Sequence, residues 1–115
     1  MIERLTVRAA SLRVAGAVAF LAGAGCALAA QPLLVSQAGR MFHPGELTIN
    51  RGDILTIVND DADLLHHAYI DSEKMTFDSG DQKPGSRINI MFSVAGDFNV
   101  LCGIHPKMRL VVHVR

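Results

Sequence analysis

The chain has 115 residues, half of them apolar, and this length accommodates one domain rather than two. Lys and Arg number 11, and so do Asp and Glu, which gives a formal net charge of zero. A neutral chain offers no electrostatic indication of a nucleic-acid partner. Of the two cysteines, Cys26 lies in an apolar N-terminal stretch and Cys102 lies near the C-terminus.

The first 30 residues have the order of a secretory signal. Three arginines come first, and an uncharged stretch rich in Ala, Gly, Leu and Val follows over residues 14–30. Ala27-Leu28-Ala29 fits the small-residue cleavage pattern. We therefore expect a signal peptide over residues 1–29, cleavage after Ala29, and export to the periplasm.

Two alternatives concern the same segment. It would serve as a permanent membrane anchor if it were not cleaved, although about 17 apolar residues is short for a spanning helix. Gly23-Ala24-Gly25-Cys26 is similar to a bacterial lipoprotein box, but Gly23 stands where Leu is expected. If residues 1–29 are removed as a signal peptide, residues 30–115 form the domain, and Cys102 is its one thiol. A single thiol in an oxidising compartment is protected when it is buried or bound to a metal.

Short apolar runs separated by Gly, Pro and Asp follow from residue 33 onward, and no stretch has a sustained helical period. Strands at this spacing indicate an all-β fold, an antiparallel sandwich or barrel. The predicted strands cover residues 33–36, 46–50, 53–59, 66–71, 87–93, 97–102 and 109–115.

Alternation within the last two predicted strands orients two sulfur-bearing residues. Cys102 has the same parity as the apolar Phe98 and Val100, and Met108 has the parity of the apolar residues in the final strand. Successive side chains of a strand point to opposite faces. Cys102 and Met108 should therefore both point inward, at the same end of the sandwich, whereas parity does not fix His105 in the turn between them.

Cys102, His105 and Met108 form a C-x2-H-x2-M motif. A thiolate, an imidazole and a thioether together suit a soft ion, above all Cu(I), and two His, one Cys and a long axial Met form the type 1 copper set. Zinc fits less well, since structural zinc sites draw on several Cys or His in paired spacings. We therefore predict one type 1 copper ion, for which a second histidine must come from elsewhere.

The pair His66-His67 supplies that histidine. His66 shares parity with Ala68 and Ile70 and should point inward, whereas His67 should point outward. We prefer His66 and keep His67 as the alternative. The predicted metal ligands are thus His66, Cys102, His105 and Met108.

Four protein ligands leave no open position of the kind that catalytic metal sites keep. We therefore expect a carrier of single electrons that cycles between Cu(II) and Cu(I), not an enzyme, and no small-molecule substrate. The alternative is a periplasmic copper storage or delivery protein, because the same soft ligands bind Cu(I).

Residues 30–115 also resemble a known family, the cupredoxins, and particularly plastocyanin-like, amicyanin-like and methylamine-utilisation-protein-like members. The resemblance lies in the closing CGIHPKM run and in a series of shorter matches: Phe42-His43-Pro44, Arg51-Gly52-Asp53, Val58-Asn59-Asp60, His66-His67-Ala68, residues 80–85 and Gly96-Asp97-Phe98. It implies an eight-stranded Greek-key sandwich with His66 as the early ligand. His67 departs from the pattern, because many members have an Asn there that ties the two ligand loops together.

The resemblance further implies that electrons leave through His105. Residues flanking the ligands, namely Leu64, Leu65, Ile104 and Pro106, would form a small apolar docking patch. Asp60, Asp61 and Asp63 form a local acidic edge, which we interpret as a solvated loop; the alternative is that it steers a basic redox partner such as a cytochrome c. The expected partner is a redox protein such as a cytochrome c or a dehydrogenase. We expect a monomer, with His43 and His113 outside the site.

Overall fold

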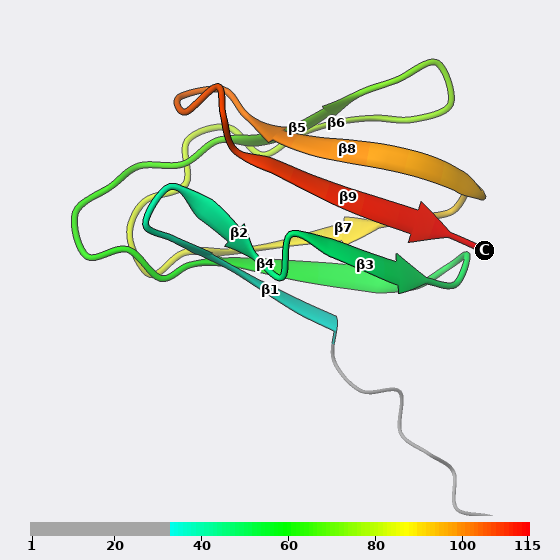
Figure 1. Ribbon diagram of the computed structural model, residues 1–115, viewed down its shortest axis with the longest axis horizontal. Helices are drawn as coiled ribbons and strands as arrows, with labels where there is room; N and C mark the ends of the chain where they lie inside the picture. Colours follow the sequence, from blue (N-terminus) through cyan, green and yellow to red (C-terminus); the bar gives the residue numbers. More distant parts are fainter. Residues whose placement is uncertain (1–32) are drawn as a thin grey trace, which may run out of the picture.

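A computed structural model describes residues 33–115, which fold into an all-β sandwich of two sheets (Figure 1). The predicted signal peptide over residues 1–29 lies outside the described residues. Within residues 33–115 no helix is long and apolar enough to cross a membrane. The described strands are β1 (Leu33–Ala38), β2 (Met41–His43), β3 (Glu46–Ile49), β4 (Ile54–Asn59), β5 (Ala68–Asp71), β6 (Thr76–Asp78), β7 (Arg87–Met91), β8 (Gly96–Cys102) and β9 (Arg109–Val114).

The first sheet has the order β2-β1-β4-β7 and the second has the order β3-β9-β8-β5-β6. Two pairs, β1 with β4 and β3 with β9, are parallel, and the other strand pairs are antiparallel. Figure 1 shows β8 and β9 stacked over β4 and β7. The predicted all-β sandwich is thus confirmed, but the expectation that its strands are all antiparallel is wrong, since β1–β4 and β3–β9 are parallel pairs.

The strand count in residues 33–115 is nine, one more than the eight that the resemblance implies. Met41–His43 and Glu46–Ile49 are close in sequence but belong to different sheets, since the chain passes from one layer to the other at Pro44-Gly45. The sequence patterns predicted neither β2 nor β6, because strands of three residues are too short to show alternation.

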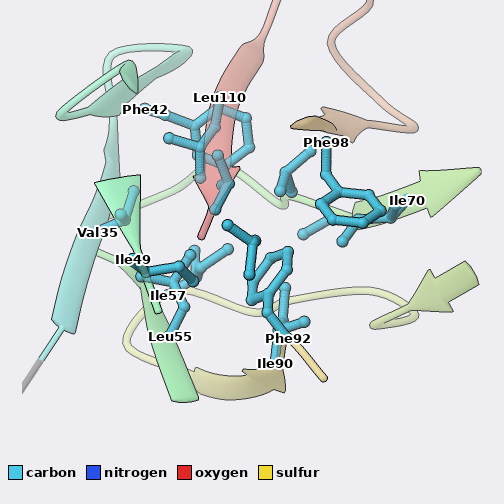
Figure 2. Close-up of a cluster of buried hydrophobic side chains, with 14 of the residues drawn as sticks. Val35, Phe42, Ile49, Leu55, Ile57, Ile70, Ile90, Phe92, Phe98 and Leu110 are labelled. Carbon is cyan, nitrogen blue, oxygen red and sulfur yellow. The ribbon is translucent and has the colours of Figure 1, made fainter. Parts of the chain in front are cut away.

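The core consists of inward-facing side chains from both sheets (Figure 2). Ile90 lies in β7 of the first sheet and Phe92 directly follows that strand, whereas Phe98 and Val100 lie in β8 of the second sheet; all four are at most 2% exposed. The rings of Phe92 and Phe98 lie 5.9 Å apart between centroids, which is within the usual range of an aromatic pair. The alternation predicted for the last strands is confirmed, because Cys102 and Met108 are also buried, at 3% and 2% exposure.

We predict that Phe92→Ala lowers the free energy of unfolding by about 3–5 kcal/mol, because it removes a ring that both sheets enclose. The neighbouring Met91 is 58% exposed and provides the matched control. Met91→Ala should change the free energy by less than about 0.5 kcal/mol. Urea unfolding of both variants measures the difference, and equal effects would contradict the assigned core.

His113 joins three strands of the second sheet on its outer face. Its Nδ1–H donates to Asp97 at 2.6 Å and its Nε2–H donates to Glu46 at 2.6 Å. Asp97 lies directly opposite His113 across β8 and β9. The hydrogen bonds to Glu46 and then to Asp97 raise the pKa of His113 above its ordinary value of 6.5. Charged His113 therefore stabilises the fold.

The hydrogen-bonded group of His113, Glu46 and Asp97, called the His113 clamp below, predicts that the stability of the fold depends on pH. The contribution of His113 should be complete below pH 6.5, its ordinary pKa, and should disappear as the pH rises through the raised pKa of the folded state. Melting temperatures of the protein and of His113→Gln, measured from acidic to alkaline pH, test it. The difference between the two should be largest at mildly acidic pH and shrink toward alkaline pH; a difference independent of pH would contradict the charged clamp.

Candidate metal centre

Two connections meet at one end of the sandwich: the segment between β4 and β5, and the turn between β8 and β9 (Figure 1). Their relative position is set by the pairing of β5 with β8, in which Ala68 lies opposite Cys102. The predicted strand over residues 66–71 begins two residues later, at Ala68. His66 instead forms a single bridge to Gln82, with backbone hydrogen bonds of 3.1 Å and 2.6 Å.

Three donor atoms converge at this end. Cys102 Sγ lies 3.9 Å from His66 Nδ1 and 3.7 Å from His105 Nδ1. The imidazole centroids of His66 and His105 are 5.0 Å apart, and the three ligand atoms all lie within 4.8 Å of one another. His66 is fully buried and Cys102 nearly so, whereas His105 is partly exposed.

Met108 closes the same turn. Its backbone N–H donates to the carbonyl of His105 at 3.0 Å, and its side chain is 2% exposed. Met108 and His105 both line a hollow of about 460 Å³ at the surface of this end, together with Arg40, Ile104, Pro106 and Lys107. The motif C-x2-H-x2-M thus brings its three side chains to one place.

The two adjacent histidines point in opposite directions, as parity predicts. The side chain of His67 is 27% exposed, and its Nε2–H donates to Asp78 at 2.5 Å. The carbonyl of His67 accepts a 2.8 Å hydrogen bond from the N–H of Gly103, the residue after Cys102. The two loops are therefore tied by the main chain at the position where the expected Asn is absent.

Asp61 contacts the far side of the His66 ring. Its Oδ2 accepts a hydrogen bond from His66 Nε2–H at 2.6 Å, and its Oδ1 accepts one from the N–H of Gly39 at 2.9 Å. The bond from Gly39 and, after it, the bond from His66 lower the pKa of Asp61, against the opposing effect of burial. The sequence placed Asp61 in an acidic edge and did not predict its contact with His66. The feature that indicates such a contact is a carboxylate five residues before a predicted metal ligand.

The pKa of His105 is also shifted in the direction that favours metal binding. Burial, followed by the proximity of His66, lowers the pKa of His105. A lowered pKa favours the neutral imidazole, the form that binds metals. The buried Cys102 thiol lies beside it, and both histidines present Nδ1 to that sulfur.

His43 and His113 lie outside this cluster. His43 Nε2 contacts the carbonyl of Ala38 at 3.2 Å, and His113 belongs to the clamp described above. In the predicted acidic edge, Asp60 accepts a hydrogen bond from the hydroxyl of Ser36 at 2.5 Å. In the predicted apolar patch, Leu65 and Ile104 are both 42% exposed.

The donor set fits a single metal ion. Two atoms bound to one ion at about 2.0–2.3 Å lie no more than about 4.4 Å apart, and the sulfur–nitrogen distances of 3.9 Å and 3.7 Å satisfy this limit. A thiolate with two imidazoles and a nearby thioether is a soft donor set. His66, Cys102, His105 and Met108 form a cluster that matches the type 1 copper ligand set.

The fold is similar to those of solved copper proteins. An amicyanin variant in the Cu(I) state matches 73% of this chain and 82% of its own, with a TM-score of 0.67 and 23% identity. A reduced amicyanin variant matches 76% and 86%, with a TM-score of 0.68 and 24% identity.

The copper-containing nitrite reductase from Thermus scotoductus SA-01 is 28% identical over 74% of this chain, with a TM-score of 0.68, but this chain covers only 22% of that protein. No protein-family model and no curated protein matches the sequence. The domain described by residues 33–115 therefore has an amicyanin-like cupredoxin fold.

Proposed function

We propose that this protein carries single electrons by means of one type 1 copper ion. The observation that carries the proposal is the convergence of His66 Nδ1, Cys102 Sγ and His105 Nδ1 within 4.8 Å of one another. Met108, buried at the end of the same turn, would add a thioether ligand. Copper bound there would provide a one-electron couple, Cu(II)/Cu(I).

The protein's own residues perform two tasks in this role. The first is to hold the ligands in place, through the bridge between His66 and Gln82 and the hydrogen bond between His67 and Gly103. The second is to exclude water, since His66, Cys102 and Met108 are buried. Four protein donors leave no position for a substrate, which supports a carrier rather than an enzyme.

His105 is the proposed exit for the electron, because it is the partly exposed member of the cluster and lines the surface hollow. Ile104 and Pro106 give that surface an apolar centre, and Arg40 and Lys107 add positive charge beside it. A redox protein such as a cytochrome c or a dehydrogenase is the proposed partner. The cations favour an acidic region on that partner, and the protein would act as a monomer.

Export completes the proposal. The signal-like segment over residues 1–29 would direct the chain to the periplasm and leave Cys102 as its one thiol. A buried cysteine in a metal site is compatible with an oxidising compartment.

Cys102→Ser is the first test. The copper-loaded protein should show an intense absorption near roughly 600 nm, typical of a Cu(II)–thiolate bond, that ascorbate bleaches reversibly. Cys102→Ser should lose this band while its circular dichroism stays that of a β-protein. A colourless protein that passes Cu(I) to an acceptor would instead support storage or delivery.

The adjacent histidines provide a matched pair of variants. His66→Ala should abolish the blue band and weaken copper binding by more than the roughly 10–100-fold that loss of an outer-sphere contact causes. His67→Ala should retain the band, because the His67 ring points to Asp78. Copper titrations followed by absorption measure both effects, and the opposite pattern would transfer the ligand role to His67.

A further inference from the structure

Among residues 33–115, the far nitrogen of His66 forms its side-chain hydrogen bond with Asp61. The side chain of Asp61 is 14% exposed, and its Oδ2 lies 2.6 Å from His66 Nε2. Two further hydrogen bonds hold Asp61 itself: its Oδ1 accepts from the Gly39 N–H at 2.9 Å, and its N–H donates to Asn59 Oδ1 at 3.0 Å. The main chain before it is held by the Asp60 N–H, which donates to the carbonyl of Gln37 at 2.9 Å. The carboxylate is thus fixed in position before it meets the imidazole.

A carboxylate can only accept hydrogen bonds, so the imidazole nitrogen that it contacts must carry the ring proton. In neutral His66 the proton then resides on Nε2, and Nδ1 keeps its lone pair. Nδ1 is the nitrogen that faces Cys102 Sγ, at 3.9 Å. The contact with Asp61 therefore selects the tautomer that a metal at the cluster requires.

We propose that Asp61 is a positioning residue that fixes the tautomer and orientation of His66 and thereby favours Cu(II) over Cu(I) at the site. The second part rests on the proposed function; the first does not depend on copper. A carboxylate that accepts the Nε2 proton increases the basicity of the ligating Nδ1. The more basic nitrogen stabilises the more highly charged ion, so Asp61 should lower the reduction potential.

Asp60 offers a matched control, since it is the adjacent residue and carries the same charge. Its carboxylate accepts from Ser36 and has no contact with His66. Asp60→Asn and Asp61→Asn therefore remove one negative charge from the same loop, but only the second alters the contact with His66. Gly39 and His66 donate to different oxygens of Asp61, so in Asp61→Asn one of the two donors faces the amide NH2 group in place of an acceptor, whereas Asp61→Ala removes both acceptors.

The first experiment uses the metal-free full chain and long-range ¹H–¹⁵N correlation spectra of the histidine rings. His66 should carry its proton on Nε2 in the unaltered protein and in Asp60→Asn. In Asp61→Ala the resonances should shift toward a mixture of the two tautomers. An Nδ1–H tautomer in the unaltered protein, or an unchanged Nε2–H tautomer in Asp61→Ala, would overturn the tautomer assignment.

The second experiment measures reduction potentials of the copper-loaded proteins. Asp61→Asn and Asp61→Ala should each lose about tenfold in Cu(II) affinity relative to Cu(I), which raises the potential by about 59 mV. Asp60→Asn should change the ratio by less than about twofold. Equal shifts in the Asp60 and Asp61 variants would show a general charge effect and overturn the tuning role. A copper-loaded parent protein without the blue band would overturn the proposed function and the tuning role, and the tautomer assignment would still be decided by the metal-free spectra.

Discussion

The register between β5 and β8 is the constraint on which the site depends. Ala68 lies opposite Cys102, so the residue two positions before Ala68 on the same face comes next to the cysteine sulfur. That residue is His66, and its Nδ1 lies 3.9 Å from Cys102 Sγ. A slip of one residue would turn His67 inward and His66 toward solvent. The buried apolar side chains of the same strands, Ala68 and Ile70 in β5 and Phe98 and Val100 in β8, oppose that slip, and thus the core determines which histidine joins the cluster.

Buried hydrogen bonds beneath the loops also hold the segment that carries His66 in place. Gln37 Nε2–H donates to Gln82 Oε1 at 2.8 Å, and Asn59 Nδ2–H donates to the carbonyls of Leu64 and Gln82 at 2.8 Å and 2.9 Å. Gln37, Asn59 and Gln82 are all buried, where a hydrogen bond is stronger than in water. They connect the first sheet to the segment that holds His66, and so both sheets support the ligand loop.

Features that depend on residues close together in the sequence could be predicted, whereas features that depend on contacts between distant residues could not. Cys102, His105 and Met108 lie within seven residues, and local parity was enough to orient Cys102 and Met108. The inward orientation of His66 was predictable for the same reason. The contacts of Gln37 with Gln82 and of Asp61 with Gly39 span 45 and 22 residues, and no local pattern indicates them. Short strands such as β2 and β6 were missed because their pairing, not their composition, defines them.

His67 and Gly103 are best understood as a pair. A Cβ atom at Gly103 would lie 3.4 Å from His67 Cγ. The absence of a side chain at Gly103 therefore leaves room for the ring of His67. The ring is held away from the cluster by Asp78 at 2.5 Å and packs edge-on against Tyr69. The tie between the loops runs from the Gly103 N–H to the His67 carbonyl, which any residue at position 67 supplies. The change from the expected Asn to His therefore removes a side-chain tie but keeps the loops joined through the main chain.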